Sequence, residues 1–187
     1  MKFFIVAMIS IILSGCTGIP RLVSPVREFE LDNYLGTWYE IARLDHSFER
    51  GLSQVTAVYS MRDDGGITVR NRGYSAADDE WREAEGTAYF VDSETVGHLK
   101  VSFFGPFYSS YVIFELDREH YRYAFVSGYN TSYLWLLSRT PTIDEAVITK
   151  FIRSARAGGF DTDKLIFVEH NGTATDVPDS PSAQQEQ

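Results

Sequence analysis

Short apolar and aromatic runs separated by turn residues dominate the chain between Gly36 and Arg139. The separators, such as Asp63–Gly66 and Gly105-Pro106, supply positive φ angles or Asx turns. Several consecutive short strands at this spacing are typical of an antiparallel sandwich or barrel, so the expected fold class is all-β. The pattern predicts eight strands, over Trp38–Arg43, Gln54–Met61, Ile67–Tyr74, Trp81–Val91, His98–Phe104, Ser109–Leu116, Tyr121–Gly128 and Tyr133–Arg139.

One amphipathic helix is predicted after the last of these strands. Thr142 and Glu145 have the spacing of an N-terminal capping box, and Gly158 is a suitable residue to end the helix. An apolar stripe follows the helical period, which indicates that this face packs against the outside of the sheet. The stripe consists of Val147, Ile148, Phe151, Ile152 and Ala155. A short final strand is expected over Lys164–Val168.

The N-terminus has the pattern of a secretory signal. Lys2 precedes an apolar run from Phe3 to Leu13, which is shorter than the about 20 residues that a transmembrane helix needs. The run leads into Leu13-Ser14-Gly15-Cys16, which resembles the bacterial lipobox. The resemblance implies cleavage after Gly15 and diacylglyceryl attachment to Cys16, and several acyl chains hold a protein stably on a membrane. Thr17, where inner-membrane lipoproteins typically carry Asp, implies the outer membrane, with the domain facing the periplasm.

These features divide the chain into four parts. We expect a lipoprotein signal peptide over residues 1–15, a lipidated N-terminus and tether over 16–30, and a folded domain over 31–170. Residues 171–187 are polar and contain two prolines, which predicts a disordered tail.

Composition excludes several classes of function. The chain has 187 residues, and its 17 Lys and Arg against 26 Asp and Glu give a net charge of −9, which disfavours nucleic-acid binding. The single cysteine excludes an intramolecular disulfide, and the four histidines lack metal-ligand spacing. No phosphate loop or nucleophile elbow is present, so we expect neither a metal nor a cofactor.

The chain resembles the lipocalin family in one motif and in the order of its elements. The motif is Gly36-Thr37-Trp38, which opens a series of eight strands followed by a helix and a short strand. Asp117 between the sixth and seventh strands matches the family's second conserved segment, although Arg118-Glu119 departs from it. Arg139 ends the eighth strand. The similarity to bacterial outer-membrane lipocalins is carried by Leu35–Arg43, Val101–Tyr108, Tyr133–Ile143 and the lipobox.

The resemblance implies an eight-stranded up-and-down antiparallel barrel with the helix packed outside. In the family the positions of Gly36, Trp38 and Arg139 close one end, with the arginine across the indole, and do not contact ligand. A barrel of eight strands encloses room for about one small ligand.

Alternation along the strands suggests which residues face the barrel interior, although one bulge would reverse the assignment and close packing would leave no cavity. The candidate lining residues are Ala57, Tyr59, Val69, Ala88, Phe90, Leu99, Val101, Phe103 and Tyr111. Arg70, Arg72 and Lys100 are expected to point outward, because a lone charge inside an apolar barrel is costly.

Four aromatic residues are expected around the open mouth, namely Phe48, Phe107, Tyr108 and Tyr129. Exposed aromatics there would guide an acyl chain, touch a membrane or meet a second copy in a homodimer. The alternative is that these loops fold back on their own aromatic side chains.

The resemblance implies a lipid-anchored binding protein whose ligand is a fatty acid, a lysophospholipid or a phospholipid, held for storage or transport. Its partners are then that ligand and, through the N-terminal lipid, a membrane. We expect no enzyme, because the family's enzymatic branch uses a pocket cysteine and Cys16 belongs to the anchor. The alternative is a structural lipoprotein with a filled barrel and a protein-binding aromatic rim.

Overall fold

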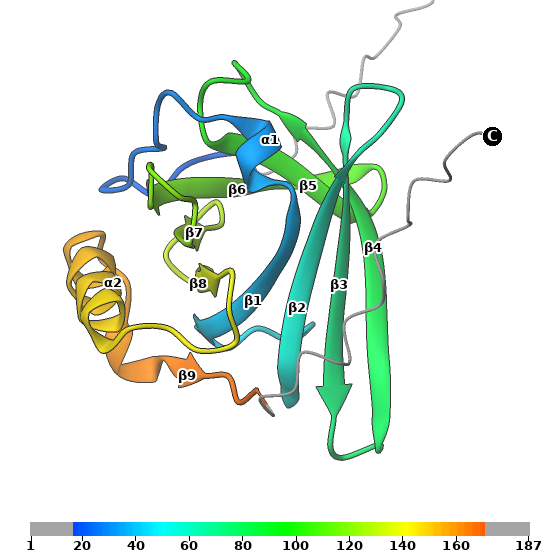
Figure 1. The fold of residues 1–187 in the computed structure, drawn as a ribbon, viewed down its shortest axis with the longest axis vertical. Coiled ribbons are helices and arrows are strands. Elements are labelled where there is room, and N and C mark those ends of the chain that lie inside the picture. The colour runs from blue at the N-terminus through cyan, green and yellow to red at the C-terminus, as the bar shows by residue number, and fades with distance from the viewer. Residues whose placement is uncertain (1–16, 171–187) are drawn as a thin grey trace, which may run out of the picture.

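Eight antiparallel strands form a closed barrel in the computed structural model, which describes residues 17–170 (Figure 1). Each strand pairs with the next along the chain, and β8 pairs with β1, so the predicted up-and-down barrel is confirmed. The strands are β1 (Gly36–Arg43), β2 (Leu52–Met61), β3 (Ile67–Ser75), β4 (Glu80–Phe90), β5 (His98–Phe104), β6 (Phe107–Leu116), β7 (Tyr123–Ser127) and β8 (Leu134–Ser138).

The observed strand bounds lie within two residues of the predicted ones at every end. The largest overestimate concerns β7, which was predicted to begin at Tyr121 and begins at Tyr123. Tyr121 has a φ of 52°, and its N–H donates to Asp117 O over 2.8 Å. Tyr121 therefore belongs to the turn, although its side chain has high strand propensity.

The predicted helix is present as α2 (Glu145–Ala157), but its capping residue differs from the prediction. Asp144, rather than Thr142, is the N-cap, and its Oδ1 accepts from Ala146 N over 2.9 Å. Because Asp and Thr are both good N-caps, the sequence offered two starting points two residues apart. The stripe faces the barrel, where the fully buried Phe151 packs against Phe125 with ring centroids 5.1 Å apart.

Three short elements complete the fold. The helix α1 (Leu31–Tyr34), which was not predicted, precedes β1. The 3₁₀-helix η1 (Thr162–Lys164) follows α2, and β9 (Ile166–Phe167) pairs antiparallel with the end of β1. The final strand is therefore shorter than predicted, because its first predicted residue lies in η1.

The segment before α1 lies along the barrel wall. Val26 accepts from Gly97 N and donates to Ile113 O, and Arg27 forms an isolated bridge with Val96. The predicted signal peptide over 1–15, Cys16 and the predicted tail over 171–187 lie outside the described residues. Within residues 17–170, no helix is long and apolar enough to cross a membrane.

Two separate apolar clusters fill the inside and cover the outside of the wall. The inner cluster contains Trp38, Tyr59, Val69, Leu99 and further residues from all eight strands. The outer cluster joins the helix to the barrel. Strand alternation explains the division, since neighbouring residues point to opposite faces of a sheet.

Candidate ligand-binding site in the barrel

Trp38 and Arg139 close one end of the barrel. Trp38 is fully buried, and its Nε1 donates to Tyr34 O over 2.8 Å. The guanidinium carbon of Arg139 lies 3.9 Å above the indole centroid, a favourable position for a cation over an aromatic face. Arg139 also donates to Thr37 O over 2.8 Å and to Asn33 O over 2.7 Å. The guanidinium therefore ties α1 and the start of β1 to the closed end.

Gly36 and Asp117 shape the same end. Gly36 has a φ of 91°, and a Cβ there would lie 3.6 Å from Arg139 Nη1. Asp117 accepts from Arg122 Nε over 2.6 Å and from its backbone N over 3.3 Å. Burial opposes the charge of Asp117, but these bonds outweigh it and lower its pKa. Both positions thus serve the geometry of the closed end.

All nine candidate lining residues lie in or against the inner cluster that also contains Trp38. Tyr59, Val69, Ala88 and Leu99 are buried there, and the remaining five are partly buried. The remaining five are Ala57, Phe90, Val101, Phe103 and Tyr111. Contact of these residues with a ligand stays a prediction.

Three tyrosine hydroxyls meet inside the barrel. Tyr111 Oη lies 2.7 Å from Tyr34 Oη and 2.8 Å from Tyr59 Oη. Three hydroxyls carry three donor hydrogens, and two bonds among them use two, so one donor remains. Burial raises the pKa of all three phenols, which keeps them protonated. Sequence reasoning missed Tyr34, because α1 was not predicted.

A buried ionic cluster lies at the opposite end of β1. Arg43 Nη1 lies 2.6 Å from Glu40 Oε1, and Arg43 Nη2 donates to Glu49 O over 2.8 Å and to Leu52 O over 3.1 Å. Burial and the carboxylate of Glu49 raise the pKa of Glu40, against the opposing effect of Arg43. Among residues 17–170, Arg43 Nε has no hydrogen-bond partner.

The loop between β1 and β2 completes this cluster. Glu49 Oε2 accepts from Trp135 Nε1 over 3.1 Å and lies 3.0 Å from His46 Nδ1. The His46 ring is stacked between Phe48 and Tyr133, at 4.8 and 5.5 Å. We refer to Glu40, Arg43, His46, Glu49 and Trp135 as the mouth cluster. Sequence reasoning did not single out its charged members.

Asn71 adds a polar group to the interior wall. It shares the inward face of β3 with Val69, and its neighbours across the ladders are Ala57 on β2 and Ala84 on β4. Its Oδ1 is buried and has no partner in the described part of the chain. Small side chains and an unpaired acceptor at one point of the wall are what a ligand-facing surface would show.

The four candidate mouth aromatics fall into two groups. Phe48 stacks on His46, and Tyr129 contacts Tyr133 with tilted rings whose centroids are 5.4 Å apart. Phe107 is 70% exposed, and Tyr108 lies on the outer face beside Tyr89, with centroids 6.3 Å apart. A position of all four around one open mouth therefore stays a prediction.

The three basic strand residues lie outside the barrel. Arg70 Nη2 lies 3.1 Å from Glu85 Oε2 on the neighbouring strand, and the guanidinium of Arg72 lies 3.8 Å above the ring of Trp81. Lys100 Nζ lies 5.3 Å from the ring centroid of Tyr108. No group of three or more His, Cys, Asp or Glu that could hold a metal ion is found among residues 17–170.

A family model and several solved structures are both similar to this chain. A family model described as a lipocalin-like domain matches residues 29–170. Solved structures with a similar fold include a cockroach allergen, Per a 4, with a TM-score of 0.63 at 21% identity over 82% of this chain and 95% of that one. Insecticyanin from the tobacco hornworm also has a TM-score of 0.63, at 20% identity over 82% and 87%.

Two bacterial relatives are similar over most of their length. One, from Vibrio cholerae, is 64% identical over 90% of this chain and 99% of its own length. The other, from Escherichia coli K12, is 53% identical over 82% of this chain and 86% of its own length. Both carry the name outer membrane lipoprotein Blc. The chain therefore belongs to the lipocalin-like family, as one of its bacterial outer-membrane lipoproteins.

Proposed function

We propose that this protein holds one small amphipathic lipid in its barrel at the outer membrane, for storage or transport. The candidate ligands are a fatty acid, a lysophospholipid and a phospholipid. The observation that carries the proposal is the barrel interior, where apolar side chains from every strand form one cluster. An acyl chain transferred from water to such a surface gains about 0.8 kcal/mol for each buried methylene group.

Polar groups inside the barrel support an amphipathic rather than a purely apolar ligand. The unpaired Asn71 Oδ1 offers an acceptor on the inner wall, and Arg43 Nε offers a charged donor in the mouth cluster. A carboxylate or phosphate head held near the mouth would pair with Arg43. The tyrosine hydroxyls, at the closed end, leave one further donor for a ligand or a water molecule.

The attachment to the membrane is proposed to be at Cys16, with the domain facing the periplasm. Its replacement by Ala should remove the acyl chains from the mature protein and move the protein from the membrane fraction to the soluble fraction. Mass spectrometry of the purified protein measures the first effect directly. An acylated protein that persists after the substitution would contradict the assignment.

Ligand binding is tested by delipidating the protein and titrating palmitate and a lysophospholipid separately. We expect saturable binding of about one ligand per barrel. Ala57→Trp, which enlarges a side chain on the inner wall, should weaken binding about tenfold or more. Val58→Trp changes the next residue of the same strand, which points outward, and should leave the affinity unchanged.

Absence of saturable binding would instead support the second reading, a filled barrel whose aromatic surface binds a protein. The exposed side chain of Phe107 is the observation that supports this alternative. We propose a binding protein rather than an enzyme, and turnover of a lipid by the delipidated chain would contradict that part of the proposal.

A further inference from the structure

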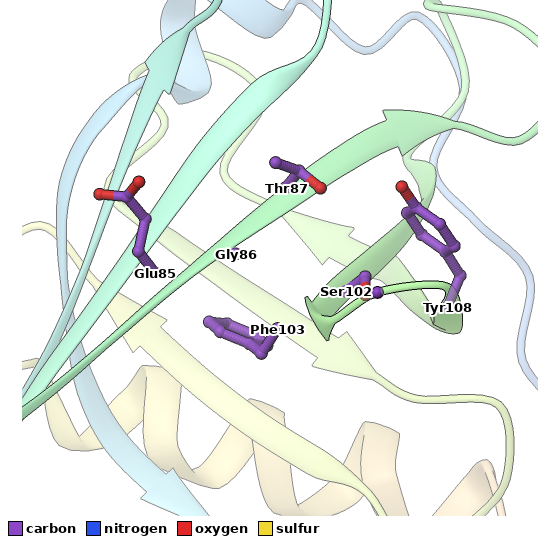
Figure 2. A pocket seen from close by; sticks show the side chains of 7 residues that line it. Glu85, Gly86, Thr87, Ser102, Phe103 and Tyr108 are labelled. Atoms are coloured by element: carbon purple, nitrogen blue, oxygen red, sulfur yellow. The ribbon is translucent and has the colours of Figure 1, made fainter.

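The hydrogen-bonded ladder between β4 and β5 covers only part of the two strands. Pairing runs from Phe90 opposite Leu99 to Thr87 opposite Ser102. Within the described chain, residues 80–86 of β4 have no partner on β5. A hollow of about 220 Å³ lies where the two strands separate (Figure 2).

The hollow has one feature of a built binding surface, a buried polar atom without a partner. Ser102 lines it and is only 6% exposed, yet among residues 17–170 its Oγ has no hydrogen-bond partner. The hollow is smaller than the roughly 300–1,000 Å³ of sites that enclose a whole small molecule. Its size suits a segment of an extended chain. Figure 2 shows its lining by Glu85, Gly86, Thr87, Ser102, Phe103 and Tyr108.

Phe103 separates the hollow from the barrel interior. Its side chain lines the hollow and also packs against the inner cluster. A Cβ at Gly86 would lie 2.9 Å from the Phe103 ring and 2.6 Å from Ser102 O, closer than real Cβ atoms come. The ring therefore rests on bare backbone, and its displacement would connect the flank of the barrel with the lumen.

The turn beside the hollow exposes two large apolar side chains. Phe104 and Phe107 face each other across the Gly105-Pro106 turn and are 82% and 70% exposed. Two adjacent phenyl rings held in water are unfavourable unless another apolar phase covers them. The charged side chain at the hollow, Glu85, is paired with Arg70, so its charge is compensated.

The described part of the chain begins on the same flank, at Thr17. The backbone of Thr17 lies near enough to the His98 ring to raise its pKa, against the larger effect of burial, and His98 Nε2 lies 3.2 Å from Ser110 Oγ. Ser110 is three residues from Phe107 along β6, which is roughly 10 Å at the rise of a strand. Cys16, the proposed lipidated residue, directly precedes Thr17. Thr17, the first described residue, therefore lies on the flank that carries the exposed turn, and the proposed lipid would be attached one residue before it.

We infer that the gap between β4 and β5 is a lateral lipid entrance. Phe104 and Phe107 dock in the phospholipid layer that holds the anchor, and one acyl chain passes beside Phe103 into the barrel. This inference rests on the proposed lipid-binding function and adds the route by which the ligand enters. The competing route is the open mouth, next to Phe48.

The docking step is tested with the mature lipoprotein reconstituted in vesicles of phosphatidylethanolamine and phosphatidylglycerol. Phe107→Trp and Phe48→Trp place an indole at the turn and at the mouth, and brominated phospholipids quench an indole that enters the acyl region. We expect strong additional quenching for Phe107→Trp and little for Phe48→Trp, relative to the parent protein. Quenching at Phe48 alone, or at neither position, would overturn the docking.

The entrance is tested by the rate at which the same protein takes up a fluorescent fatty acid from such vesicles. Thr87→Trp, which enlarges a side chain that lines the hollow and points away from the inner wall, should slow uptake about tenfold and leave the equilibrium affinity unchanged. The double variant Phe104→Ser/Phe107→Ser alters exposed residues only, so it retains the fold and should also slow uptake about tenfold.

Phe48→Ser is the matched control and should leave the rate unchanged. Equal uptake rates in all variants, with normal equilibrium binding, would refute the lateral route alone. Absence of binding in the parent protein would instead refute the proposed function on which the route rests.

Discussion

The Arg43→Met substitution tests whether the mouth cluster is held together by its one buried cation. Arg43 is 1% exposed, and its guanidinium contacts Glu40 Oε1 and donates to the carbonyl oxygens of Glu49 and Leu52. Methionine fills a similar volume without the charge, so the change isolates the ionic and hydrogen-bonded contribution.

The expected loss follows from what remains buried. Breaking a buried pair by removing one partner costs about 3–5 kcal/mol, because the other charge loses its compensation. We therefore expect the free energy of unfolding to fall by about 4 kcal/mol, a large part of the roughly 5–15 kcal/mol of a typical domain. Urea unfolding followed by tryptophan fluorescence measures this change.

A double variant and a surface control make the result specific. Glu40→Gln together with Arg43→Met also removes the carboxylate that Arg43 compensates, and should recover part of the loss because the pair is then neutral. Arg50 also pairs with an acidic residue, Asp45, over 2.6 Å, but both side chains are exposed. Arg50→Met should therefore leave the unfolding midpoint unchanged.

The stability loss caused by Arg43→Met should depend on pH through the ionisation of Glu40. Burial and Glu49 raise the pKa of Glu40 in the folded state, and Arg43 opposes this. A carboxyl whose pKa is raised by folding contributes stability at low pH that is lost as the pH rises through the folded pKa. The deficit of Arg43→Met should thus shrink between about pH 7 and about pH 5. A loss below about 1 kcal/mol that does not change over this range would refute the reasoning.

Three further substitutions test the closed end, the helix and a buried histidine. Gly36→Ala should lower the thermal midpoint, with a loss of about 1 kcal/mol or more, because a φ of 91° strains any side chain; an unchanged midpoint would contradict this. Phe151→Ala should cost about 3–5 kcal/mol in urea unfolding, since the ring is fully buried under the helix, and a loss below about 1 kcal/mol would show that the helix packs loosely. Burial lowers the pKa of His98 in the folded protein. The folded state is therefore destabilised relative to the unfolded state as the pH falls below the unfolded pKa of about 6.5. His98→Gln should make the thermal midpoint decline less steeply below about pH 6.5, and equal slopes in both proteins would contradict this.

The strands were predictable because their turns have strong local chemistry. Segments such as Asp63–Gly66 and Gly105-Pro106 fix the chain reversals, and the runs between them contain aromatic and branched residues. The start of α2 was less certain, since Thr142 and Asp144 are both competent caps. The single turn of α1 carries too few residues for any periodicity.

The apolar wall was predictable from alternation, but the mouth cluster was not. Counting outward from Trp38 in steps of two places Glu40 and Ala42 inside and Arg43 outside. The register of β1 against β8 shifts between Glu40 and Ala42, and this bulge turns Arg43 to the face of Trp135. Glu49 then reaches the cluster from a loop. A one-residue insertion in pairing has no signature in a single sequence, so these contacts required the structure.

The aromatic residues differ in what covers them, and this difference supports the assignment of a membrane-facing flank. Trp38 is covered by Arg139 at the closed end, and Phe125 is covered by Phe151 from the helix. Phe104 and Phe107 have no such cover among residues 17–170, and each leaves most of its surface in water. In a freely diffusing acidic domain two such rings would promote association. In an outer-membrane lipoprotein the phospholipid layer is always within reach of the anchor, so the same exposure becomes favourable where that layer covers the turn.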